Sequence, residues 1–223
     1  MIYYCISDIH GCLSAFNNAL NVVIEHLEEE NTALILLGDY IHGGEDSYGV
    51  LDRIIELQRK YRNNKVIALL GNHDEYVCDG FGSIDENGNE SEKYDEYINW
   101  MCNLPRYYVD EKTIFVHAGI DEEAEDMWEY GTSDFVFTEK FPPETGHFYE
   151  DYKIVAGHVY TSEVAGNPNF NGIYYDGESH YYIDSDVLSN GFLNILKVDT
   201  ETQEYFEVTE NGDFSVLPYD KED

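Results

Sequence analysis

Basic side chains are scarce in this chain of 223 residues, which has 12 Lys and Arg, 46 Asp and Glu, and a formal net charge of −34. Binding to nucleic acid relies on clustered Lys and Arg that neutralise phosphates, so this composition excludes a nucleic-acid partner. The excess carboxylates are typical of a solvated acidic surface. An anionic ligand would therefore need a strong local positive centre to overcome the repulsion from the rest of the molecule.

Long apolar runs are also missing, since no stretch approaches the roughly 20 apolar residues of a membrane-spanning helix. The first residues lack a basic region and a small-residue cleavage site, and their apolar run is typical of a strand. We therefore expect no membrane partner and a cytoplasmic location. A hydrophobic content of 43% is nevertheless enough for a sizeable core.

Cysteine is rare as well. The four cysteines show no CxxC spacing; they are Cys5, Cys12, Cys78 and Cys102. In a chain of this length we expect reduced thiols, mostly packed in the core, and not a disulfide framework. No linker or internal repeat divides the chain, so we expect a single domain over residues 1–223.

Apolar strands and amphipathic helices alternate in the first 70 residues. The pattern predicts strands at 2–7, 33–37 and 65–70, with helices at 13–29 and 48–61 between them. Ser47 is the expected N-cap of the second helix. Since strand–helix–strand units pair their strands in parallel, these elements predict an α/β fold with a parallel sheet.

The second half has a different organisation. A polar, glycine-containing stretch at 79–93 precedes a short helix at 94–103, and a long acidic connection covers 118–150. Further strands are predicted at 113–117, 153–157, 172–176, 180–184, 192–199 and 204–208. Because the later strands are close together and joined by turn residues, we expect hairpins in a second, more antiparallel sheet.

Polar residues with ligand chemistry follow five of the predicted strands, directly where each strand ends. They occur in "SDIHG" (Asp8, His10), "GDY" (Asp39), "GNHD" (Asn72, His73, Asp74), "VHAG" (His117) and "AGH" (His158). Ligands of parallel α/β sheets bind beyond the carboxyl ends of the strands. Since neighbouring strands lie only about 4.8 Å apart, these side chains are expected to converge on one spot.

These oxygen and nitrogen donors suit Mn²⁺, Fe or Zn²⁺. Six such groups are too many for one tetrahedral ion, but they suit two ions that share a carboxylate and act together on a phosphoryl group. Any one of these residues alone is usually a turn residue or a cap. Their repetition at five strand ends favours the metal hypothesis, whereas His26, His147 and His180 lie outside such contexts and are interpreted as ordinary residues.

The motifs "DIHG", "GDYIHGG", "GNHD", "VHAGI" and "GHVYT" occur in the order found in the calcineurin-like metallophosphoesterases. Over residues 1–200 the chain resembles the bacterial phosphoprotein-phosphatase branch of that superfamily. The resemblance implies an α-β-β-α sandwich of two mixed sheets. It also implies a centre of two divalent metal ions, for which manganese is the first candidate and iron or zinc are the others.

The resemblance assigns a role to each motif residue. Asp8 and His10 would hold the first ion, and Asp39 would bridge the two ions. The second ion would be held by Asn72, His117 and His158. A metal-bridging hydroxide would attack the phosphate ester, and His73 would protonate the leaving oxygen.

The stretch after Asp39 departs from the family pattern G-D-x-x-D-R-G. His42 stands where the family has an Asp that orients the acid histidine, and Gly43 stands where it has a phosphate-binding Arg. A second family Arg is missing too, because residues 118–157 contain only Lys140 and Lys153 as basic residues other than histidine. We hypothesise that His42 takes over by bonding His73 or the phosphate; alternatively, it is a loop residue without a role.

Two classes of function therefore remain open. The first is a metal-dependent phosphoesterase that acts on a phosphoprotein, as a serine/threonine-type phosphatase, or on a dinucleotide polyphosphate or another small phosphorylated molecule. The second is a metal-binding pseudo-phosphatase that serves as a binding or regulatory module. Some of the 20 tyrosines are candidates for stacking on a base, although most are expected in strands. The sequence leads to no prediction of oligomeric state.

Overall fold

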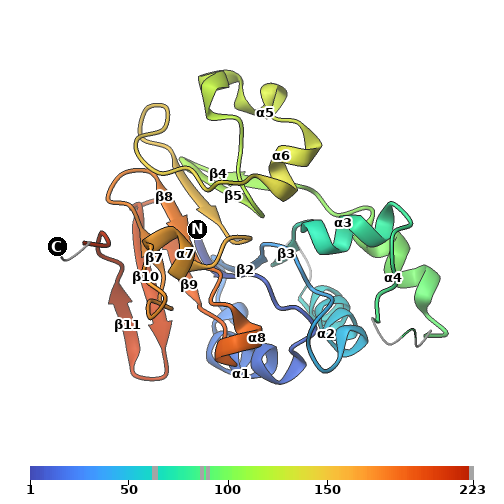
Figure 1. The fold of residues 1–223 in the computed structure, drawn as a ribbon. Coiled ribbons are helices and arrows are strands. Elements are labelled where there is room, and N and C mark those ends of the chain that lie inside the picture. Colours follow the sequence, from blue (N-terminus) through green and yellow to red (C-terminus); the bar gives the residue numbers. More distant parts are fainter. Residues whose placement is uncertain (62–64, 86–87, 89–90, 221–223) are drawn as a thin grey trace.

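The computed structural model describes residues 1–61, 65–85, 88 and 91–220. Within them the strands form two sheets (Figure 1), the first with the order β11-β10-β9-β1-β2-β3. Its strands are β1 (Ile2–Ile6), β2 (Thr32–Leu36), β3 (Val66–Ala68), β9 (Leu196–Asp199), β10 (Glu204–Thr209) and β11 (Gly212–Ser215). The pairs β1–β2 and β2–β3 are parallel, whereas β9 pairs with β1 in the antiparallel sense.

The second sheet has the order β4-β5-β6-β8-β7. Its strands are β4 (Tyr107–Asp110), β5 (Thr113–Val116), β6 (Lys153–Ala156), β7 (Tyr174–Tyr175) and β8 (His180–Tyr182). The pairs β5–β6 and β6–β8 are parallel, and the outer pairs β4–β5 and β7–β8 are antiparallel. Both sheets are thus mixed, and their central parallel strands end at the same side of the molecule.

The helices cover the outer faces of the two sheets (Figure 1). They are α1 (Leu13–Val23), α2 (Ser47–Lys60), α3 (Asn72–Cys78), α4 (Tyr94–Met101), α5 (Trp128–Gly131), α6 (Asp134–Glu139), α7 (Thr161–Ala165) and α8 (Val187–Asn190). Two 3-10 helices, η1 (His26–Glu28) and η2 (Glu122–Met127), complete the helical elements of the described residues. None of the helices in these ranges is long and apolar enough to cross a membrane.

Three clusters of buried apolar residues show how the layers pack. One lies between the sheets and joins Cys5 and Ile35 of the first sheet to Phe115 and Val155 of the second. A second cluster fills the space between the first sheet and α1, α2 and α4, and the third lies between the second sheet and the helices of the 118–150 connection. The alternation of inward and outward side chains along each strand creates these layers. The predicted α-β-β-α sandwich is confirmed.

Several local expectations were wrong. The helix predicted at 13–29 ends at Val23, and the first turn of α2 is capped by the Asp46 carboxylate, which accepts from the Gly49 N–H at 2.8 Å, and not by Ser47. The last two predicted strands join the first sheet beside β1 and not the second sheet. The 118–150 connection holds η2, α5 and α6. Residues 86–87 and 89–90 of the predicted polar stretch lie outside the described residues.

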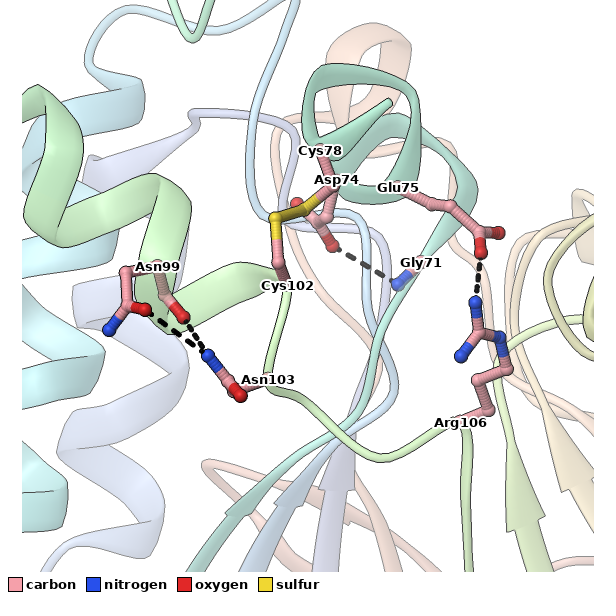
Figure 2. The surroundings of a disulfide bond; sticks show 8 residues. All are labelled: Gly71, Asp74, Glu75, Cys78, Asn99, Cys102, Asn103 and Arg106. Carbon is pink, nitrogen blue, oxygen red and sulfur yellow. Dashed lines mark hydrogen bonds and ion pairs between the residues drawn. A yellow bond between two sulfur atoms is a disulfide. The ribbon is translucent and has the colours of Figure 1, made fainter. Parts of the chain in front are cut away.

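The expectation that all four cysteines are reduced was also wrong. Cys78 at the end of α3 forms a disulfide with Cys102, which directly follows α4 (Figure 2). Their Cα atoms are 5.6 Å apart, a separation that suits a disulfide. No sequence motif reveals this pair, because the two cysteines are 24 residues apart and meet only through the packing of α3 against α4. Cys5 and Cys12 are free and buried, as expected.

Candidate active site and metal centre

The residues predicted as ligands come together where strands of both sheets end. Asp8 and His10 follow β1, Asp39 follows β2, Asn72 follows β3, His117 follows β5, and His158 follows β6. The site joins distant parts of the chain, since the backbone N–H of His158 donates to the Asp8 carboxylate at 3.1 Å across 150 residues. The geometry thus brings all six residues to one place.

The carboxylate of Asp39 lies at the centre of this arrangement. Its Oδ2 is 3.8 Å from His10 Nε2 and 3.6 Å from His117 Nε2. Donor atoms of Asp39, His10 and His73 lie within 4.8 Å of one another, and so do those of Asp39, Asp8 and His117. Asp39 belongs to both groups, which is the position expected of a carboxylate shared by two cations.

The tautomers of two histidines fit a cation. His117 Nδ1 donates to the Leu37 carbonyl at 3.0 Å, and burial lowers the pKa of His117, so its Nε2 is unprotonated. That nitrogen faces the Asn72 Oδ1 at 2.9 Å. His10 Nδ1 likewise lies 3.3 Å from the Ile41 carbonyl, which leaves its Nε2 directed at Asp39. Burial lowers the pKa of His10, but Asp39 and Asp8 outweigh this and raise it, so a cation bound at its Nε2 would take the place of a proton. The unprotonated Nε2 of His117 suits a divalent metal ion directly, and backbone carbonyls commonly orient ligand histidines in this way.

The backbone at these positions is strained. Five residues of the site have positive φ angles although none is glycine: Asp8 (52°), His10 (48°), Asp39 (57°), His42 (75°) and His158 (65°). Such conformations cost of order 1–3 kcal/mol each and persist where the surrounding structure enforces them. Here each strained residue turns its side chain toward the site directly after a strand or in the loop that follows it.

The buried Asp74 holds the Asp39 loop, a role that its place in the "GNHD" motif did not predict. Asp74 is fully buried and accepts from the N–H groups of Asp39 (2.9 Å), Tyr40 (3.1 Å) and Gly71 (3.2 Å). The loops approach so closely that a Cβ on Gly71 would lie 2.2 Å from the Asp39 backbone nitrogen. Burial raises the pKa of Asp39 to about 7, which a bound cation would oppose.

His42 bonds the candidate acid His73 through their Nδ1 atoms, which are 2.9 Å apart. The other nitrogen of His42, Nε2, donates to the Ser83 carbonyl at 2.9 Å, because a carbonyl only accepts. A neutral His42 therefore has an unprotonated Nδ1, and the Nδ1–H of His73 donates to it. His42 can hold the ring of His73, as a carboxylate would, but it brings no negative charge. Burial and the neighbouring His10 and His42 lower the pKa of His73 to about 4.

A pocket of about 500 Å³ opens beside these two histidines. Its lining residues are His42, Asn72, His73, Tyr76, Gly82, Ser83 and Glu139, and they include neither Lys nor Arg. Lys140 donates to the Ile120 carbonyl and contacts Glu144, and Lys153 donates to the Glu178 carbonyl. Both lysines therefore have partners away from the pocket. Part of the 79–93 stretch does line the pocket, through Gly82 and Ser83.

His180, which belongs to none of the strand-end motifs, has a highly charged environment. His180 is 2% exposed and lies between Asp176 Oδ2 at 2.8 Å and Glu122 Oε1 at 2.9 Å. Burial lowers its pKa, but the two carboxylates outweigh this and raise the pKa of His180 to about 9. We refer to His180, Asp176 and Glu122 as the His180 cluster; it lies outside the candidate site.

A family model described as calcineurin-like phosphoesterase matches residues 1–200. The chain belongs to this family. Curated relatives of this chain include two proteins named symmetrical bis(5'-nucleosyl)-tetraphosphatase. The one from Nitrosospira multiformis is 30% identical over 128 residues, which cover 54% of the chain and 44% of the relative. The one from Proteus mirabilis is 31% identical over 143 residues, which cover 60% and 48%. The chain therefore spans less than half the length of these relatives.

Solved structures support the family fold. A cold-active protein tyrosine phosphatase of a psychrophilic Shewanella species has a TM-score of 0.60 at 14% identity, covering 97% of this chain and 80% of that one. A protein serine/threonine phosphatase from Saccharomyces cerevisiae has a TM-score of 0.60 at 14% identity, covering 89% and 72%. At such low identity these similarities concern the fold alone.

Proposed function

We propose that this chain is a phosphoesterase that depends on two divalent metal ions and hydrolyses small phosphorylated molecules, with dinucleoside polyphosphates as the substrate class. The observation that carries the proposal is the convergence of six donor residues on one site centred on Asp39, whose Oδ2 lies within 3.8 Å of histidine nitrogens from both sheets. The substrate class rests on the curated relatives, which are named bis(5'-nucleosyl)-tetraphosphatases. Because the ligands come from both sheets, we also propose that residues 1–223 act as one domain.

In this proposal the donor residues divide into two sets around Asp39. Asp8 and His10 hold one ion; Asn72, His117 and His158 hold the other. Divalent ions in such a site supply Lewis acidity to a phosphoryl group and a nucleophilic water at neutral pH. They also provide the local positive centre that the acidic chain needs to bind an anionic substrate. The donor set suits manganese, iron or zinc.

In the proposed reaction the cationic form of His73, protonated on both ring nitrogens, gives its Nε2 proton to the leaving oxygen and becomes neutral. Its Nδ1–H is held by His42, 2.9 Å away, so its Nε2 is oriented for a phosphate ester in the pocket. A general acid in such a position contributes typically about 10²–10⁴ in rate. Because His42 lacks the charge of a carboxylate, it stabilises the cationic form of His73 poorly, and we expect slow turnover of ordinary phosphomonoesters.

The test compares three substrates with the manganese-loaded protein: diadenosine tetraphosphate, p-nitrophenyl phosphate and a phosphoserine peptide. We expect the highest kcat/KM for the dinucleotide, with nucleoside diphosphate as product, as symmetrical cleavage of a tetraphosphate requires. Asp39→Asn is the control for contaminating phosphatases and should lower kcat/KM by roughly 10² or more. A preference for the phosphopeptide would overturn the substrate class.

A pseudo-phosphatase is the second candidate. It is favoured by the replacement of the family Asp and Arg by His42 and Gly43, and by the lack of Lys and Arg among the residues that line the described pocket. This candidate predicts that metal binds and raises the melting temperature while none of the three substrates is hydrolysed above the rate of Asp39→Asn. Turnover of any of them that depends on Asp39 excludes it.

A further inference from the structure

Two exposed aromatic side chains lie next to the candidate acid. Tyr76 and Phe81 are 54% and 57% exposed, and their ring centroids are 5.4 Å apart. Tyr76 is one of the residues that line the pocket with His73 and Asn72. Exposed aromatic rings are unremarkable when scattered singly, but a pair at the mouth of a site is a candidate for binding.

The local structure holds this pair in place. The Phe81 N–H donates to the Tyr76 carbonyl at 3.0 Å, and a Cβ on Gly82 would lie 3.5 Å from the Tyr76 ring. Two residues after Tyr76, the disulfide of Cys78 with Cys102 ties the end of α3 to the end of α4 (Figure 2). These contacts fix the backbone that carries both rings, so less conformational freedom is lost when a ligand stacks on the pair.

The position of Tyr76 specifies which part of a substrate it meets. Tyr76 follows His73 by three residues in α3, and residues with this spacing share one face of a helix. His73 is proposed to protonate the leaving oxygen, so the group attached to that oxygen extends toward Tyr76. In a symmetrical cleavage this group is a nucleoside diphosphate, so its base lies at the far end, beyond two phosphates and a ribose. There the exposed rings of Tyr76 and Phe81 offer the base an apolar, planar surface.

We propose that Tyr76 and Phe81 form a stacking platform for the nucleobase of the leaving nucleotide. The proposal rests on the proposed function. In it, the platform is the reason why the protein prefers nucleotides to phosphorylated molecules that have no base. The metal centre binds the phosphates, and the platform recognises the base by its flat face, with little discrimination between bases. Stacking of one base on an aromatic ring commonly changes affinity by roughly tenfold.

The first experiment measures kcat/KM for diadenosine tetraphosphate and for inorganic tripolyphosphate, which has no base. In Tyr76→Ala, and less strongly in Phe81→Ala, we expect the ratio of the two values to fall roughly tenfold, mainly through KM for the dinucleotide. Tyr76→Phe should keep the wild-type ratio, because it keeps the ring. Tyr130→Ala is the matched control, since Tyr130 is 83% exposed but lies in α5 and does not line the pocket. An equal loss on both substrates would overturn the platform.

A binding measurement separates this proposal from the proposed function. Calorimetry with manganese compares ADP with pyrophosphate, and the platform predicts tighter binding of ADP by roughly tenfold in the wild type and near equality in Tyr76→Ala. This result would support the platform even in a protein without hydrolytic activity. Equal affinities in the wild type would overturn it, whatever the activity. If Tyr76→Ala melts early, Tyr76→Leu and Phe81→Ala provide the same comparison.

Discussion

His73 and the His180 cluster place the same side chain in opposite electrostatic environments. His73 has the imidazoles of His42 and His10 as neighbours, and these together with burial lower the pKa of His73 to about 4. His180 lies between two carboxylates that raise its pKa to about 9. The comparison shows that both side chains bonded to His180 are carboxylates, whereas the side chain bonded to the candidate acid is the imidazole of His42.

Replacement of His73 or His180 by asparagine should give the largest difference between the two regions, with one variant losing activity and the other losing stability. His73→Asn is expected to lower kcat by about 10²–10⁴, because it removes the proton donor to the leaving oxygen. It should change the melting temperature little, since the ring is partly exposed at the pocket. His180→Asn should show the opposite, with a lower melting temperature and a kcat near that of the wild type. The measurements are steady-state kinetics and thermal unfolding of the manganese-loaded proteins.

The His180 cluster should also make stability depend on pH. The pKa of His180 is raised to about 9 in the folded state, so its contribution to stability is fully present below the unfolded pKa near 6.5. The contribution falls as the pH rises through 9, by about 3 kcal/mol in total. Urea unfolding at several pH values should show this loss in the wild type, and His180→Asn should lose much less stability over the same range. Parallel curves for the two proteins would show that the histidine is not charged in the folded state.

Removal of metal should destabilise the region around the candidate metal centre. Asp8, Asp39 and Asp74 are buried close together, and cations that bind only the folded state stabilise it by about 2.7 kcal/mol at a hundredfold excess over Kd. We expect EDTA to lower the melting temperature by roughly 5–10 °C and manganese to restore it. The same shift is expected in His180→Asn, because its cluster lies outside the site. A melt unaffected by verified metal removal would contradict a preformed centre.

The smallest expected effect comes from giving His73 a carboxylate partner of its own. His42→Asp should stabilise the cationic form of His73 and raise kcat/KM on p-nitrophenyl phosphate by roughly tenfold. Aspartate tolerates the positive φ of 75° at this position better than most residues. His42→Asn is the matched control, since it lacks the charge. Equal rates for the two variants would show that charge beside His73 does not limit turnover.

The family Arg is a poorer replacement in this chain. Gly43 has a φ of +96°, and a Cβ added there would lie 2.7 Å from the Leu188 side chain. Gly43→Arg would therefore strain the loop that holds His42.

The sequence was most informative where a pattern is local. The apolar periodicity of residues 2–60 predicted β1, β2 and α2, because each signal lies within a few residues, whereas the sandwich of two mixed sheets was implied by the resemblance of the strand-end motifs to a known family. The helix α3 was missed because "GNHD" directly follows a strand and reads as a turn. The disulfide, the hydrogen bonds of Asp74 and the partners of His180 depend on segments up to 58 residues apart, which no local pattern reveals.

The place of β1 in the first sheet has a consequence for synthesis on the ribosome. Its residues pair with β2 on one side, but the other edge is covered only by β9, which begins at Leu196. At 5–20 residues per second, synthesis from Leu36, the end of β2, to Leu196 takes on the order of 8–32 s. During that time the nascent chain carries an apolar strand with an open edge, the kind of surface that pairs with other chains. We expect the ribosome-bound chain to need protection by chaperones until β9 has emerged.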